Sequence, residues 1–145
     1  MNRTYLRQAT TADLPEILNL ISGSNLPVSD IAPDKQLFVV AEAENQLIGC
    51  AGLEIYGESG LFRSLSVRQD RRNRKTGRDL LAGVVALSRE NNIKHLYLLT
   101  TTADLYFKRM GWQPIERTEV PDDIRASTEF SSVCPSTASC MMYAL

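Results

Sequence analysis

Basic side chains gather in one short stretch of the sequence, between residues 68 and 78. They are Arg68, Arg71, Arg72, Arg74, Lys75 and Arg78, with Asp70 as the acid among them. A predicted strand ending in Leu65-Ser66-Val67 precedes the stretch, and a predicted helix follows it. The first N–H groups of a helix lack internal partners, the helix dipole makes that end positive, and Gly77 lets a ligand approach the main chain. The stretch therefore predicts a polyphosphate site.

A solvated loop is the competing interpretation of this stretch, because most charge runs have no ligand. The order of elements favours the ligand site: a strand, the basic turn, a helix with Gly77 at its start, then a strand and a short helix ending in Gly111. Nucleic-acid binding is not expected, since the formal net charge is −1 and no aromatic residues alternate with the basic ones.

Composition limits the other possibilities. The chain has 145 residues, 43% of them apolar, which fits one globular domain. Its longest nearly apolar stretch, Leu80 to Leu87, is too short to span a membrane, and the start lacks the apolar run of a signal peptide. We therefore expect a cytoplasmic protein with no membrane partner. Three cysteines without a Cys-x-x-Cys pair predict reduced thiols and no metal site. The single histidine, His95, is expected at a strand edge and excludes chemistry that needs two histidines.

Helices and strands must position the basic stretch. Around Leu6 we expect a strand, followed by a helix that is capped by Thr11 or Asp13 and ends at Gly23. Its apolar positions share one helical face: Leu14, Ile17, Leu18 and Ile21. The runs 37–43, 46–56 and 61–67 predict an antiparallel meander of three strands. Alternation along the second strand places five residues on one face: Ile48, Cys50, Gly52, Glu54 and Tyr56.

Beyond the basic stretch, Thr76 and Asp79 predict a capped helix that ends at Asn91-Asn92. It would bury Leu80, Leu81, Val84, Val85 and Ser88. A strand at 96–99 follows, then a short helix opened by Thr101-x-x-Asp104 and ended by Gly111. Further patterns predict a strand at 113–119, a helical turn from Pro121 toward Phe130, and a closing strand at 141–144. Together these elements predict an α/β fold around a sheet of mixed direction.

The sequence resembles the GCN5-related N-acetyltransferase (GNAT) superfamily. The signature of that family is Arg or Gln, two residues, Gly, one residue, then Gly or Ala. Here Arg72-Asn73-Arg74-Lys75-Thr76-Gly77 occupies it, with Lys75 where the signature has its first Gly. A lysine does not cheaply adopt a positive φ. Residues 6–14 are similar to the family's opening strand and helix, and Phe107-Lys108-Arg109-Met110-Gly111-Trp112 to its aromatic-to-Gly-aromatic segment.

The resemblance implies a single-domain GNAT fold over residues 1–145, with a mixed, mostly antiparallel central sheet flanked by helices and with splayed central strands. It also implies an acyltransferase with acetyl-CoA as cosubstrate, whose acetyl group lies where the strands splay apart. The implied cofactor contacts are Leu65, Ser66 and Val67 for the pantetheine arm, and Arg72, Asn73, Arg74, Lys75, Thr76, Gly77 and Arg78 for the pyrophosphate. Phe107 also belongs to this set and stands where many members carry a tyrosine that protonates the leaving thiolate.

A narrower resemblance is to acetyltransferases encoded beside arsenic-resistance genes and to the related phosphinothricin acetyltransferases. It lies in residues 52–57 and 61–65 and in the tail from Ile124 to Met141, and Phe107 suits that group. The resemblance implies a small-molecule amine acceptor, a glutamate-like amino acid such as arsinothricin or phosphinothricin. The sequence does not decide between a monomer and a homodimer. The alternative function is a non-catalytic acyl-CoA-binding or interaction module of the same fold.

Acetyl transfer to an amine needs a base, an oxyanion donor and a proton for the leaving thiolate. Glu54 is the candidate base, with a carboxylate paired to a neighbouring strand as the competing interpretation. A backbone amide near Leu65 or Val67 is the candidate oxyanion donor, and Tyr106 is a candidate proton donor.

Two arginines are candidates for binding the acceptor. Arg63 and Arg125 would hold its carboxylate or oxyacid in forked pairs, although each would also suit a surface ion pair. Cys134 and Cys140 would suit trivalent arsenic as thiolates, but small buried cysteines are the commoner explanation, and we expect no metal site.

Overall fold

The computed structural model describes residues 4–24, 26, 28–29, 31, 36–72, 75–101, 103–127, 130 and 138–145. In these residues one seven-stranded sheet has the strand order β1-β2-β3-β4-β5-β7-β6. The strands are β1 (Tyr5–Gln8), β2 (Gln36–Ala43), β3 (Gln46–Tyr56), β4 (Ser59–Val67), β5 (His95–Thr100), β6 (Gln113–Pro114) and β7 (Ser139–Ala144). Neighbouring strands are antiparallel except β4 and β5, which are parallel. The predicted α/β fold with a mixed, mostly antiparallel sheet is confirmed.

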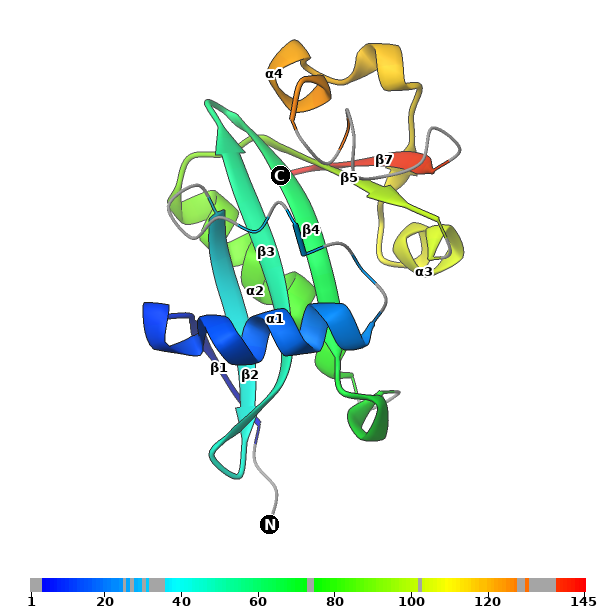
Figure 1. The fold of residues 1–145 in the computed structure, drawn as a ribbon. Coiled ribbons are helices and arrows are strands. Elements are labelled where there is room, and N and C mark those ends of the chain that lie inside the picture. Colours follow the sequence, from blue (N-terminus) through cyan, green and yellow to red (C-terminus); the bar gives the residue numbers. More distant parts are fainter. Residues whose placement is uncertain are drawn as a thin grey trace.

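Helices cover both faces of this sheet. They are α1 (Leu14–Gly23), α2 (Thr76–Glu90), α3 (Asp104–Arg109) and α4 (Asp122–Arg125), with 3₁₀ turns at Thr11–Asp13, Gln69–Arg71 and Arg117–Glu119. Figure 1 shows α1 crossing one face of β2, β3 and β4, while α2 lies behind the opposite face. Because α2 is the crossover between the parallel strands β4 and β5, it begins where β4 ends. Among the described residues, no helix has both the length and the apolar character to cross a membrane.

Each face of the sheet has its own apolar core. Under α1, Ile17 and Ile21 lie one turn apart and pack with Phe38, Val40 and Cys50. Under α2, Leu80, Leu81, Val84 and Ser88 of the predicted stripe are buried, and Val85 is only partly buried. Leu87, which was not in the predicted stripe, is also buried against the sheet. Burying an aliphatic side chain of this size contributes about 1.5–3 kcal/mol. Both helices are therefore fixed on the sheet by several such side chains, and the start of α2 is fixed relative to β4.

The sequence predicted most of these elements. The three-stranded meander, the end of α1 at Gly23, the end of α2 before Asn91 and the end of α3 before Gly111 are confirmed. Two details were wrong. The strand predicted at 113–119 covers only Gln113–Pro114, because proline has no N–H to continue the ladder and Arg117–Glu119 forms a 3₁₀ turn. The prediction that Thr101 opens the short helix was also wrong: α3 begins at Asp104 with Ala103 as its N-cap residue. The N–H of Ala103 donates to the hydroxyl of Thr100 at 3.0 Å.

A bulge in β3 changes which residues share a face. The register of β2 against β3 shifts between Ala41 and Glu42, so that Ile48 is an extra residue in β3. Ile48 packs in the α2 core, whereas Cys50 packs in the α1 core. The prediction that Ile48 lies on the same face as Glu54 was therefore wrong, because simple alternation fails across a bulge.

Candidate active site

Strands β4 and β5 run side by side for only part of their length. Their pairing covers Ser59–Leu61 against His95–Tyr97, but β4 continues to Val67 and β5 to Thr100. Figure 1 shows the two strands diverging toward the ends that lead to α2 and α3. In α/β sheets, ligands bind outside the carboxyl ends of parallel strands at such a break. The predicted splay is confirmed, and the opening is the first part of the candidate site.

A second bulge lies at this opening, in β4. Ala51 of β3 faces two residues of β4, Ser64 and Leu65, because the register shifts between Cys50 and Gly52. Ser64 has a φ of 61°, a left-handed conformation that costs a non-glycine residue about 1–3 kcal/mol. Such strain persists only where the surroundings hold it, and it is concentrated at ligand sites.

Side chains from two strands hold the β4 bulge. The thiol of Cys50 and the hydroxyl of Ser66 donate to the Ser64 carbonyl, at 3.7 Å and 3.4 Å. Nε of Arg63 donates to the Ser64 hydroxyl oxygen at 3.1 Å. Burial raises the pKa of the Cys50 thiol to about 12, so this cysteine stays protonated and inert. The bulge is therefore supported from within the protein.

Helix α2 begins beside the opening without a side-chain cap. Its N-cap residue is Lys75, and no side chain accepts a hydrogen bond there. The prediction that Thr76 is the cap was wrong: Thr76 is the first helical residue and is buried, with its methyl group close to Gly49. The N–H groups of Thr76, Gly77 and Arg78 come before the first N–H that donates back to Lys75, that of Asp79. An anion at this end would be an acceptor for them.

Lys75 adopts a left-handed backbone conformation, although a positive φ is unfavourable for lysine. Its φ is 65° and its ψ is 3°. Lys75 thus has the backbone conformation that suits the glycine of the family signature, at a cost of about 1 kcal/mol or more for a residue with a Cβ. The Lys75 residue is exposed, so its ammonium adds positive charge at the start of α2.

The basic stretch is only partly open to a ligand. Three of its cations contact other groups of the protein. Arg68 pairs with Asp70 at 2.7 Å, and Arg71 pairs with Glu44 at 3.8 Å. Nε of Arg72 donates to the Val67 carbonyl at 3.0 Å. Lys75 and Arg78 make no ion pair with any part of the chain that the structure describes. Asn73 and Arg74 lie outside the described residues. Among the residues that the structure describes, the positive charge without an ion pair at the start of α2 is that of Lys75 and Arg78.

Helix α3 carries two neighbouring aromatic residues that point to different places. A Cβ built on Gly77 would lie 3.3 Å from the Tyr106 hydroxyl, so this hydroxyl sits against the first turn of α2. Phe107 points inward instead, is 5% exposed, and packs edge-to-face with Phe62 at 5.9 Å between ring centroids. Of the two, only Tyr106 places a polar atom against the start of α2.

On the α1 face, Glu54 is the centre of a buried polar cluster. Its carboxylate accepts hydrogen bonds from Nη1 of Arg63 and Nε2 of Gln36, both at 2.7 Å, and from the Tyr56 hydroxyl at 2.5 Å. The side chains of Arg63 and Glu54 are 1% and 11% exposed. Arg63 thus connects this cluster to the β4 bulge, since its Nε bonds Ser64. Glu54 and Arg63 form a buried pair with each other, whereas the competing interpretation from the sequence was a surface pair for each.

Sequence reasoning missed Gln36, and it placed Tyr56 on the same face as Glu54 without giving it a role. Without the bulge at Ile48, the two-residue turn of the β2–β3 hairpin would place Gln36 opposite Leu53; with it, Gln36 faces Glu54. The signal that was available was the i, i+2 spacing of Glu54 and Tyr56 on one strand. Burial and the hydrogen bond to Glu54 raise the pKa of Tyr56. Tyr56 therefore stays a hydrogen-bond donor to the carboxylate.

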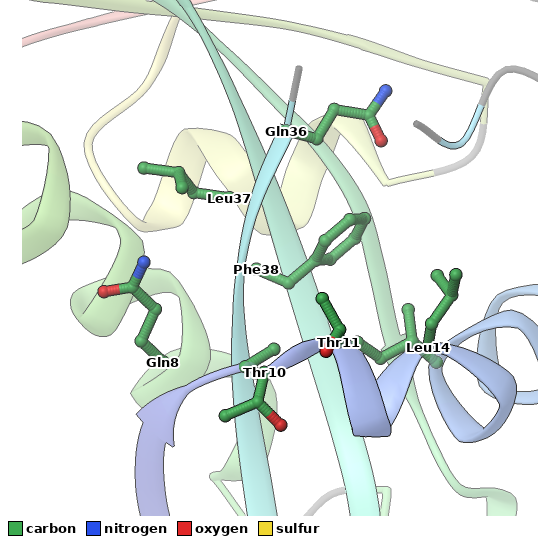
Figure 2. A pocket seen from close by; sticks show the side chains of 9 residues that line it. Gln8, Thr10, Thr11, Leu14, Gln36, Leu37 and Phe38 are labelled. Atoms are coloured by element: carbon green, nitrogen blue, oxygen red, sulfur yellow. The ribbon is translucent and has the colours of Figure 1, made fainter. Parts of the chain in front are cut away.

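Next to this cluster lies a small cavity between α1 and β2. Its volume is about 110 Å³. Among the described residues, the lining is Gln8, Ala9, Thr10, Thr11, Leu14, Ile17, Gln36, Leu37 and Phe38, and none of these side chains is charged. Figure 2 shows Phe38 and Leu14 on one side of it, and Gln36 at the start of β2. Because Gln36 also donates to Glu54, the cavity and the buried cluster share a wall.

The remaining predicted residues lie elsewhere. Arg125 is exposed on α4 and pairs with Asp122 of the same helix, three residues away. Cys140 is buried in β7, and burial raises the pKa of its thiol to about 11, which disfavours the thiolate that metals and arsenic bind. Cys134 lies outside the described residues.

Comparison with known proteins gives the family. The sequence profile of the acetyltransferase (GNAT) domain matches residues 34–114, more than half of the chain. An uncharacterized N-acetyltransferase of Chlorobaculum tepidum is 30% identical over 146 residues, covering 94% of this chain and 91% of the relative. The chain belongs to the GNAT acetyltransferase family. It is an acyltransferase, and acetyl-CoA is its cosubstrate.

Larger proteins share part of their length with this chain. The amino-acid acetyltransferase of Ralstonia nicotianae is 29% identical over 130 residues, which are 83% of this chain but 29% of the relative. N-acetylglutamate synthase of Neisseria gonorrhoeae, solved with coenzyme A and N-acetyl-glutamate, superposes with a TM-score of 0.85 at 23% identity. That match covers 99% of this chain and 35% of the synthase. The chain thus spans about a third of the length of these proteins.

Proposed function

We propose that this N-acetyltransferase acetylates the α-amino group of a small, glutamate-like amino acid. The observation that carries the proposal is the buried cluster of Glu54, Arg63, Gln36 and Tyr56, which places a carboxylate and a guanidinium beside the β4 bulge. The similarity to amino-acid acetyltransferases and to N-acetylglutamate synthase supports an amino-acid acceptor. One domain over residues 1–145 is part of the proposal, and so is the cytoplasm, where the unpaired thiols of Cys50 and Cys140 would stay reduced.

The opening between β4 and β5 would hold the cosubstrate. Residues Leu65, Ser66 and Val67 lie beyond the last β4–β5 pair, so their backbone is available to the pantetheine arm. The uncapped N–H groups at the start of α2, with Lys75 and Arg78 nearby, would hold the pyrophosphate. Gly77 lacks a Cβ that would reduce the space there. The residues present therefore fit the family's cosubstrate, which supplies an activated acetyl thioester.

The chain supplies two further chemical needs. Glu54 would take a proton from the acceptor nitrogen, directly or through a water, so that the neutral amine attacks. A backbone N–H near Leu65 or Val67 would stabilise negative charge on the carbonyl oxygen, because strand separation leaves N–H groups there without a β5 partner. The departing thiolate would take a proton from solvent.

Acceptor binding would rearrange the buried cluster. In the structure Arg63 holds Glu54, so both groups are occupied. An acceptor carboxylate that pairs with Arg63 would take the place of Glu54 and release it to accept a proton. Arg125, exposed on α4, is the candidate for a second acidic group of the acceptor. The cavity beside Gln36 would receive other atoms of the acceptor.

The finer form of the proposal names the acidic group. An arsinic or phosphinic acid at the end of a glutamate-like side chain, as in arsinothricin or phosphinothricin, presents the oxygen atoms that an arginine fork binds. The resemblance of residues 52–57 and 61–65 to acetyltransferases of arsenic-resistance operons supports this acceptor class. The assay below compares acceptors that carry a carboxylate, a phosphinate or an arsinate as the second acidic group.

Release of free thiol from acetyl-CoA tests the proposal. The panel contains glutamate, its phosphinic and arsinic analogues, neutral amino acids, and amines without a carboxylate. We expect turnover with the acidic α-amino acids and none with amines that lack the carboxylate. Turnover confined to amines without a carboxylate would contradict the acceptor class. Calorimetric binding of CoA without turnover of any acceptor would favour the non-catalytic module.

A further inference from the structure

The hydroxyl of Tyr106 lies at the start of α2, whereas a proton donor to the leaving thiolate would lie beside the acetyl thioester. It sits against Gly77, 3.3 Å from where a Cβ would be, in the first turn of α2. The sequence had paired Tyr106 with the leaving thiolate. The structure instead puts it at the helix end whose N–H groups lack a side-chain cap.

The surroundings of Tyr106 fix this position. Its ring packs edge-to-face on Phe107, with 5.3 Å between centroids, and Phe107 is anchored in an aromatic cluster with Phe62 and Trp112. The start of α2 is fixed in turn, since Leu80 and Leu81 are buried one turn further on. The hydroxyl is thus held across the gap between α3 and α2 by packing at both ends.

Charges of both signs lie near Tyr106. The guanidinium of Arg78 and the carboxylate of Asp79 act on its hydroxyl in opposite directions. Lys75 is exposed at the N-cap, one residue before the first turn. Burial raises the pKa of Tyr106, so the hydroxyl keeps its proton at neutral pH and can donate it in a hydrogen bond.

We propose that Tyr106 is a cosubstrate-binding residue, whose hydroxyl donates a hydrogen bond to the pyrophosphate of acetyl-CoA at the start of α2. It completes an anion site formed by the N–H groups of Thr76, Gly77 and Arg78 with the ammonium of Lys75. This inference rests on the proposed cosubstrate site and adds to it a contact from α3, across the opening from α2. It also gives Gly77 a second reason to lack a side chain, since a Cβ would crowd the hydroxyl.

The test compares Tyr106→Phe with the wild-type chain. The substitution removes only the hydroxyl and keeps the ring packing on Phe107. Calorimetry measures the dissociation constants of CoA, inorganic pyrophosphate and pantetheine. A hydrogen bond to a charged group predicts a roughly tenfold weaker binding of CoA, weaker pyrophosphate binding, and unchanged pantetheine binding. Where an acceptor is turned over, kcat should stay within about twofold. Leu105→Ala, on the same helix and exposed, is the control and should change none of these.

A second variant keeps the test independent of folding. Gly77→Ala should weaken CoA binding in the wild-type chain but have a smaller effect in Tyr106→Phe, because the added methyl group then meets no hydroxyl. Equal effects in both backgrounds would overturn the proposal. So would a fall in kcat with a changed basic limb of the pH profile and unaltered CoA binding, which is the result for a proton donor. Weaker CoA binding in a chain that acetylates no tested acceptor would uphold this inference while sinking the proposed acceptor class. Absence of CoA binding to the wild-type chain would overturn both.

Discussion

The buried pair of Glu54 and Arg63 allows a quantitative prediction. In Glu54→Gln the shape and one acceptor oxygen remain, but the guanidinium of Arg63, whose side chain is 1% exposed, loses its counter-charge. Removing one partner of a buried pair typically costs about 3–5 kcal/mol. Because the Glu54 side chain keeps 11% exposure, we expect the lower end, about 3 kcal/mol. With a urea m-value of about 2 kcal/mol/M, the midpoint should fall by about 1.5 M.

Urea unfolding, followed by the fluorescence of Trp112, measures this change. Trp112 is the only tryptophan in the sequence, is 2% exposed, and packs against Phe62 and Phe107. The double variant Glu54→Gln with Arg63→Met removes both charges and should recover about 2 kcal/mol of the loss, since a buried pair is often replaceable by apolar packing.

A surface pair provides the matched control. Glu58 and Lys94 also meet at 2.7 Å, but their side chains are 68% and 70% exposed. We expect Glu58→Gln to leave the midpoint unchanged within error, because exposed pairs contribute little. If Glu54→Gln behaves like Glu58→Gln, or if the two losses in the double variant simply add, the buried-pair interpretation of this cluster is refuted.

Four further outcomes follow from the structure. Glu54→Gln should lower turnover at least tenfold in buffer without urea, where the variant is folded, with the CoA dissociation constant nearly unchanged. Weaker CoA binding would argue against the role of Glu54 as base. Lys75→Gly should raise the free energy of unfolding by about 0.5–1 kcal/mol, because glycine adopts the positive φ without strain, and a loss would contradict that conformation. Gly77→Leu should weaken CoA binding at least tenfold in calorimetry. Asp13→Asn should lower stability by about 1 kcal/mol near pH 6, because Asp13 accepts from Arg7 and from the Thr10 N–H. Arg7 lowers the pKa of Asp13 from 3.8 to about 2, so the wild-type advantage is present above about pH 4 and should vanish as the pH falls toward 2.

The predicted elements were correct where the signals are local. The apolar spacing of α1 and α2, the turn Glu44-Asn45 and the helix end at Gly111 all depend on residues within a few positions of one another. The same holds for the junction from Val67 into α2, which is why the basic stretch could be placed at the carboxyl end of a strand from sequence alone.

The partners of the polar residues could not be predicted in this way. The bulge at Ile48 moves Gln36 opposite Glu54, and the bulge at Ser64 puts Arg63 and Ser66 on the same face three positions apart. A bulge depends on how two strands and the helices on each face pack together, and the residues at these two positions, isoleucine and serine, carry no local sign of it.

The sequence by itself determined the order of helices and strands, the strand-turn-helix junction with Gly77, and the family signature around it, because these depend on neighbouring residues. Only the tertiary structure decided that Lys75 adopts a left-handed conformation, that Glu54 is buried against Arg63, and that Tyr106 reaches the start of α2. The physical reason is that each of these contacts joins segments that are distant in the chain or holds a strained backbone, and their stability comes from the packing of the whole sheet and its helices.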